Sequence, residues 1–132
     1  VQWDIREAGD NGPVAAGTTG QLRAGLISFS GVPAAAVGSA GISSDTLTAT
    51  NDLMVSGVDF AAGGTAAGDP APHMWLTPSA DVPYVVVRDQ VALMIEVSTA
   101  MSVNTNVGCR LECAIVTLDQ STLNQLLRTQ SV

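Results

Sequence analysis

The sequence predicts an all-β fold: an antiparallel sandwich or jelly roll of about eight strands, followed by a short C-terminal helix. The strongest observation is the strict alternation in VALMIEVSTAMSV (91–103), where every second residue is apolar or Thr. A period of two is the pattern of a strand. Gly- and Pro-rich turns recur between other short β-branched segments, at spacings typical of sandwiches. Near the C-terminus the period changes from that of a strand to that of a helix.

The chain has the size and composition of one domain. Its 132 residues are enough to bury most apolar surface around a single core. Hydrophobic residues make up 46%, which is ordinary, but charged residues make up only 13%, about half the usual share. We therefore expect a single domain over residues 1–132, with a weakly charged surface of the kind that packs against neighbours.

The first half of the chain is expected to supply strands separated by turns and loops. VQWDIRE (1–7) alternates and is followed by AGDNGP, a turn sequence. QLRAGLISFSG (21–31) is the second strand. DTLTATNDLMVSGVDF (45–60) is expected to form two strand pieces, broken near its middle. The small residues of 32–45 predict a surface loop.

The middle of the chain contains the most flexible-looking stretch. AAGGTAAGDPAP (61–72) has no large side chain, which predicts a flexible loop or an arm ordered by a partner. HMWLTPSADVP (73–83) is expected to form a short strand and a proline-bounded turn, and YVVVR (84–88) a compact β-branched strand.

The last third is expected to form a hairpin and then a helix. NTNVG (104–108) predicts the hairpin turn that joins 91–103 to a final strand, CRLECAIVTL (109–118). The tail is predicted to be helical over 119–130, with Asp119 or Ser121 as its cap. This helix is too short to stand alone, so its leucine stripe must dock on the sheet or on a neighbouring subunit. The stripe is formed by Leu123, Leu126 and Leu127.

The two cysteines, Cys109 and Cys113, fall on one face of the predicted final strand, among aliphatic residues. Four strand steps separate their Cα atoms by roughly 13 Å, beyond the ~7 Å that a disulfide spans. A free cysteine in such a place behaves as a small hydrophobe, so we expect a structural role in the core and a reducing compartment. An intermolecular disulfide remains open. A zinc site would need two further ligands, and the sole histidine, His73, cannot supply both.

Catalytic and metal chemistry have little support in the sequence. His73 is a candidate base for a small hydrolase together with Ser79 or Asp81, but no GxSxG elbow accompanies them. A partly exposed histidine at a strand start is the simpler interpretation, and we expect no enzyme, no cofactor and no metal. Oxygen donors near loops do not match a calcium-binding loop. These donors are Asp10, Asn11, Asp45, Asn51, Asp52 and Asp59.

The charge argues against nucleic acid as a partner. Twelve acidic residues and five basic ones, all arginine, give a net charge of −7. Binding to phosphates needs clustered cations, which scattered arginines do not provide. No apolar run approaches the ~18 residues of a membrane span, so no membrane contact is expected. The N-terminus lacks the pattern of an uncleaved signal peptide, which is expected both of a cytosolic product and of a mature secreted chain.

In general character the whole chain resembles the decoration, or cement, proteins of tailed-phage heads. The features that carry the resemblance are the Ala-, Gly- and Thr-rich β segments, the loops GVPAAAVGSAG (31–41) and AAGGTAAGDPAP (61–72), and the tail DQSTLNQLLRTQSV (119–132). Some members of that group are jelly rolls that form trimers over capsid junctions and bridge major capsid proteins. The resemblance implies such a role here, and it carries no functional residue over.

We therefore expect a virion structural protein on the capsid exterior, assembled in the host cytoplasm. Its expected partners are the major capsid protein and further copies of itself, as a homotrimer. The alternatives are a carbohydrate- or receptor-binding β sandwich, on a phage fibre or a cell surface, and a small major coat protein. The expected contacts lie in the N-terminal strand, the 61–72 loop and the segment after it. The residues are Val1, Trp3, Ile5, Gly63, Gly64, Thr65, His73 and Trp75.

Overall fold

The computed structural model describes residues 1–29, 47–63 and 71–129. This part of the chain is all-β and antiparallel, with one short C-terminal helix, as the sequence predicts. It contains six strands instead of the expected eight. The elements are β1 (Gln2–Glu7), β2 (Thr19–Phe29), β3 (Met54–Gly63), β4 (Ala71–Trp75), β5 (Gln90–Thr99), β6 (Thr105–Arg110) and α1 (Gln120–Thr129).

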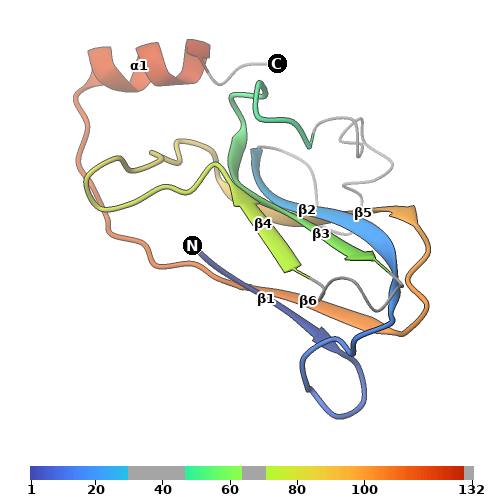
Figure 1. Ribbon diagram of the computed structural model, residues 1–132. Helices are drawn as coiled ribbons and strands as arrows, with labels where there is room; N and C mark the ends of the chain where they lie inside the picture. The colour runs from blue at the N-terminus through green and yellow to red at the C-terminus, as the bar shows by residue number, and fades with distance from the viewer. Residues whose placement is uncertain (30–46, 64–70, 130–132) are drawn as a thin grey trace.

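The strands form two layers (Figure 1). A four-stranded sheet has the order β4-β3-β2-β5, and a two-stranded ribbon pairs β1 with β6. The side of the larger sheet that faces the ribbon is called the inner face below, and the opposite side the outer face. Alternation along β2 sends Leu22, Ala24 and Leu26 to the inner face.

The ribbon closes the inner face over β2 and β3. Leu22, Phe60 and Ala62 form a buried cluster on the larger sheet, and Ile5 of β1 and Val107 of β6 pack against it. The Trp3 indole nitrogen donates a 3.0 Å hydrogen bond to Ser56 Oγ, which ties β1 to the middle of β3. Burying these side chains supplies the hydrophobic free energy that holds the two layers together.

The outer face has its own core. Ile27, Leu47, Leu53 and Met54 are buried together there, and Trp75 and Met94 pack partly against them. The segment that leads into β3 is fixed by turns: Asn51 accepts from the Leu53 amide through its side chain and from the Met54 amide through its carbonyl. Its side chain and backbone thus direct the chain into the strand.

Two expected strands do not form in the described residues. YVVVR (84–88) runs without strand pairing, although its Tyr84 hydroxyl donates to the carbonyl of Asp52 at 2.7 Å. DTLTATNDLMVSGVDF gives one strand, β3, because turns occupy the residues just before Met54. β-branched residues favour a strand only where a neighbouring edge offers hydrogen bonds.

The last third also differs from expectation. NTNVG (104–108) is not a hairpin turn, because β6 already begins at Thr105 and lies in a different sheet from β5. The alternation of 91–103 is interrupted where the pairing with β2 shifts, between Gln21↔Thr99 and Leu22↔Val97. The final strand pairs only as far as Arg110, whose partner Gln2 opens β1.

The predicted flexible segment 61–72 is partly strand. Its first residues, 61–63, end β3, and its last two, 71–72, begin β4. Residues 64–70 and the predicted loop over 32–45 lie outside the described residues. Among the described residues, no helix combines the length and apolar character needed to cross a bilayer.

Candidate functional site

A row of four ionisable side chains crosses the outer face of the larger sheet. The strand register aligns His73 on β4 with Asp59 on β3, Asp59 with Arg23 on β2, and Arg23 with Glu96 on β5. Arg23 binds Asp59 through two hydrogen bonds, from Nε at 2.6 Å and from Nη2 at 2.9 Å. Such a bidentate pair fixes the guanidinium plane as well as its charge.

Trp75 completes this cluster. Its indole nitrogen donates to Asp59 Oδ1 at 3.2 Å, and the Arg23 guanidinium lies 5.1 Å from its ring centroid, a cation–π distance. Arg23 also donates to the carbonyl of Leu47 at 3.0 Å. Burial by itself would raise the pKa of Asp59, but the hydrogen bonds from Arg23 and Trp75 outweigh it and hold this pKa below its ordinary value. We call Arg23, Asp59 and Trp75 the clamp. Their polar groups bind one another and hold β2, β3 and β4 together.

Two glycines make room for the clamp. Gly25 and Gly57 face each other across β2 and β3, and Trp75 is the β4 partner of Gly57. A Cβ at Gly57 would lie 2.4 Å from the Trp75 ring, and one at Gly25 would lie 2.5 Å from Met54 Cε. Glycine is needed at Gly57 because the Trp75 ring occupies the space that a side chain would take, whereas a Cβ at Gly25 would meet the flexible ends of Met54 and Leu47.

The hydrolase role considered as an alternative for His73 has no support in this geometry. Its register partner is Asp59, whereas Ser79 Oγ accepts from the Val82 amide at 3.1 Å within a turn. The structure does not place His73, Ser79 and Asp81 as a hydrogen-bonded triad. Within the described ranges, no group of three His, Cys, Asp or Glu side chains is arranged to hold a metal ion.

The loop oxygens mostly stabilise turns. Asp10 accepts from the Gly12 amide at 2.8 Å, and Asn51 accepts from the Leu53 amide. The carbonyl of Asp52 accepts from Tyr84, and Asp59 belongs to the clamp. Asp45 lies outside the described residues. These roles are those that Asp and Asn commonly take in turns.

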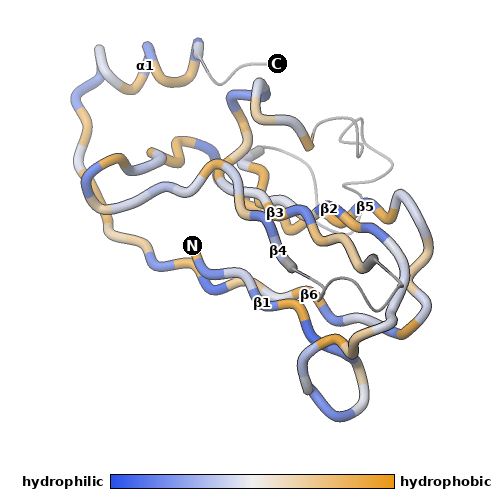
Figure 2. The backbone as a smooth tube through the Cα atoms, in the orientation of Figure 1, coloured by the Kyte–Doolittle hydropathy of each residue, from blue (hydrophilic) through white to orange (hydrophobic). Residues whose placement is uncertain are grey.

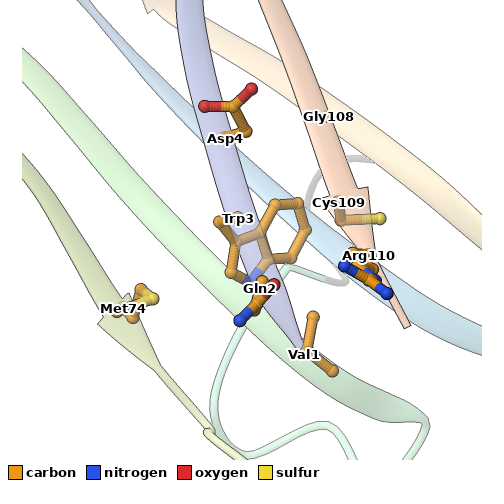
Figure 3. A pocket seen from close by; sticks show the side chains of 8 residues that line it. All are labelled: Val1, Gln2, Trp3, Asp4, Met74, Gly108, Cys109 and Arg110. Atoms are coloured by element: carbon orange, nitrogen blue, oxygen red, sulfur yellow. The ribbon is translucent and has the colours of Figure 1, made fainter. Parts of the chain in front are cut away.

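An open groove lies between the start of the ribbon and β4 (Figure 3). Trp3 and Met74 line it from opposite sides, and the remaining lining comes from the first residues of β1 and the last residues of β6. Burial raises the pKa of the Cys109 thiol in this groove, so the thiolate that would be a nucleophile is disfavoured. The groove residues are Val1, Gln2, Trp3, Asp4, Met74, Gly108, Cys109 and Arg110.

The residues expected to form contacts are spread over both faces. Trp3 bonds to Ser56 on the inner face, whereas Trp75 lies over the adjacent Gly57 on the outer face. The two indoles therefore do not form one carbohydrate platform. Val1 lines the groove, Ile5 packs in the inner core, His73 is exposed, and Gly63 ends β3, while Gly64 and Thr65 lie outside the described residues.

The expectation for the cysteines is correct in part. Both thiols are free, and Cys109 is half-buried, but Cys113 is exposed instead of lying in the core. The reason is that β6 loses its partner after Arg110, so the residues beyond it have no second layer to face. The expected core position required the strand to continue within the sandwich.

The apolar surface that β5 leaves exposed was not predicted from the sequence. We call Val91, Leu93, Ile95 and Val97 the β5 strip; their exposed fractions are 37, 41, 48 and 54%. They belong to the inner face, next to the buried residues of β2, but the ribbon leaves them partly open. Alternation identifies them as one face of a strand and contains no information on what covers it.

A second exposed apolar region follows β6. We call residues 111–129 the C-terminal arm; Leu111, Ile115 and Val116 are exposed in it, Ile115 completely. Figure 2 shows apolar residues along this segment and alternating character in α1, none of whose residues is buried. Exposed apolar patches are typical of surfaces that contact another molecule.

Comparison with known proteins gives no assignment. No family model matches the chain, and neither a curated protein nor a solved structure is significantly similar to it. The fold and its surfaces define the class: a small, two-layered antiparallel β protein with exposed aliphatic surface at one sheet edge and along a C-terminal arm.

Proposed function

We propose that this chain is a structural assembly protein that works in a homo-oligomer, as a decoration or cement protein on the outside of a viral capsid. Its partners in this proposal are further copies of itself and the major capsid protein, whose shell it stabilises. Neither role requires catalysis, a cofactor or a metal.

The observation that carries the proposal is the pairing of a closed core with open aliphatic surfaces. The clamp and the inner core are satisfied within the chain, whereas the β5 strip and the arm are not. Exposed aliphatic area favours association because covering it removes it from water, at about 25 cal/mol per Å². A chain built in this way is most stable when a protein surface covers it.

The capsid role rests on the general resemblance of the sequence to phage decoration proteins. A jelly-roll topology, a trimeric state and a position on the virion exterior belong to the same proposal. The net charge of −7 supports an exterior position, because an acidic protein is repelled by packaged nucleic acid.

Mass spectrometry of particles purified on a density gradient tests the capsid role. Particles from the source of this chain should contain it at a fixed copy number relative to the major capsid protein. Shells freed of it by mild denaturant should disassemble at a lower temperature, and adding it back should restore the original temperature. Particles that lack the chain, or that contain it in variable traces, would contradict the proposal.

A further inference from the structure

The β5 strip lies beside a buried row on the same sheet face. The register pairs Leu93 with Leu26, Ile95 with Ala24 and Val97 with Leu22. The β2 members of these pairs are at most 5% exposed, whereas the β5 members are about half-exposed. The ribbon of β1 and β6 thus covers the inner face over β2 and β3 and stops short of β5.

The same strand has a free edge. β5 is the last strand of the larger sheet, and its ten residues pair on one side only, with β2, among the described residues. An unpaired edge beside an uncovered aliphatic face offers both backbone hydrogen bonds and side-chain contacts to an incoming strand.

The C-terminal arm has the properties of such a strand. Leu111, Cys113 and Ile115 continue the alternation of β6 that places Val107 in the inner core. Within the described part of the chain, no backbone hydrogen bond joins residues 111–118 to another segment. The helix that ends the arm is capped by Asp119, which accepts from the Thr122 amide at 2.7 Å, although none of the helix residues is buried.

The arm does not reach the β5 strip of its own chain. Figure 1 shows it leaving β6 beside the N-terminus and carrying α1 away from the connection between β5 and β6. Residues 111–119 would span about 30 Å if fully extended, and the ten residues of β5 span about 33 Å. The arm therefore matches β5 in length and the β5 strip in apolar character, and it projects outward from its own body.

We propose that the C-terminal arm of one copy docks along the β5 strip and edge of a second copy. The inference rests on the proposed self-association and names the surface that makes it. We choose a second copy as the partner because each chain carries both an arm and a β5 strip, so two copies can cover each other's exposed surfaces. Exchange can close between two chains or around a ring, and in both cases every arm and every strip is covered.

Photo-cross-linking between isotopically distinct chains tests this contact. A ¹⁵N-labelled full-length chain with p-benzoyl-phenylalanine in place of Ile115 is mixed with unlabelled wild-type chain, unfolded, refolded together and irradiated. Trypsin cuts after Arg88, Arg110 and Arg128, so β5 falls in peptide 89–110 and the probe in peptide 111–128. We expect heavy arm peptides joined to light 89–110 peptides, with fragment ions that place the link within 91–97.

The control carries the same probe in place of Val82, an exposed apolar residue of the loop before β5. It should give no link between chains at 91–97. Links only between heavy peptides would show that the arm folds back on its own chain and would overturn the inference. Links between chains at another segment would overturn it as well, but would leave the proposed self-association standing. A chain that is monomeric at every concentration would contradict both.

Charge substitutions give a second measurement that does not depend on the probe. Ile115→Asp changes a fully exposed side chain, so it should leave folding intact and weaken self-association about tenfold or more. Ile95→Asp should weaken it similarly, and the double variant should be much less than additive because both changes break one contact. Val82→Asp should have no effect. Unchanged association in Ile115→Asp would contradict the proposal.

Discussion

β2 and β5 are neighbours in one sheet, but their side chains on the inner face differ in burial. Leu26 and Leu93 are register partners on the same face, and their exposed fractions are 4 and 41%. Their local sequences alternate in the same way, so the difference arises from the ribbon above them and not from the strands themselves. The apolar side chains of β2 and β3 are covered within the chain, whereas those of β5 and the C-terminal arm are exposed.

The largest expected effect comes from truncating the two partner leucines. Leu26→Ala should lower the free energy of unfolding by about 3 kcal/mol, because it leaves a cavity in a packed core. Leu93→Ala should lower it by only about 1 kcal/mol in the monomer, because much of the side chain is already in water. Denaturant unfolding in dilute solution measures both, and equal losses would show that the comparison is wrong.

The clamp of the closed region can be broken by a single methyl group. Gly57→Ala should cost about 2 kcal/mol, because its Cβ would displace the Trp75 ring from Asp59 and Arg23. Gly108→Ala is the matched control in the ribbon: its Cβ would lie 3.9 Å from the nearest atom, the Asp4 carbonyl oxygen. The control should stay within about 0.5 kcal/mol of wild type. Thermal unfolding followed by tryptophan fluorescence distinguishes the two.

Ser28 and Ser56 are both buried, but only Ser56 has a hydrogen-bond partner among the described residues, so they test what that bond contributes to stability. Ser56→Ala removes the acceptor of Trp3 and should cost about 1 kcal/mol, because the indole N–H loses its partner. Ser28 is equally buried, but its hydroxyl has no hydrogen-bond partner in the part of the chain that the structure describes. Ser28→Ala should therefore leave the free energy of unfolding unchanged or slightly raised. A larger loss for Ser28→Ala than for Ser56→Ala would contradict the assigned bond.

The smallest effect is the pH dependence of the clamp. The pKa of Asp59 is lower in the folded chain than its ordinary value of about 3.9, so the unfolded chain binds the proton more tightly. The stabilisation is therefore complete above about pH 5 and is lost as the pH falls through the folded pKa. Both side chains of the ion pair are about 40% exposed, which limits the contribution to about 1 kcal/mol or less. Asp59→Asn should show a flatter decline between pH 5 and pH 2 than wild type.

The sequence predicted the class of fold because alternation and turn residues are local signals. The alternation in 91–97 identified β5, and the leucine spacing identified the helix seen at Gln120–Thr129. Sequence could not decide which expected strands find partners: YVVVR has the right residues and no paired edge, and CRLECAIVTL runs past the end of β1.

The candidate surfaces were harder to predict than the fold. The contact residues chosen from sequence included Ile5 and Trp75, which the structure uses for packing inside the chain. From sequence alone the β5 strip cannot be told from a core strand, because apolar residues alternate along it in the same way as along a buried strand. One signal in the sequence indicated that both faces of β5 need a cover. Ala92 and Met94 make the face opposite the β5 strip apolar too, as in a strand that is covered on both faces.

Hydrogen exchange of the arm amides tests the central claim most directly. Residues 111–118 lack backbone hydrogen bonds within the described chain, so in an isolated copy they should exchange at the rate of unstructured peptide. We predict that at high protein concentration these amides are strongly protected, together with the free edge of β5, and that dilution removes both protections at one concentration. Exchange of 111–118 at the unstructured rate at every concentration would contradict the claim that a second copy covers the arm.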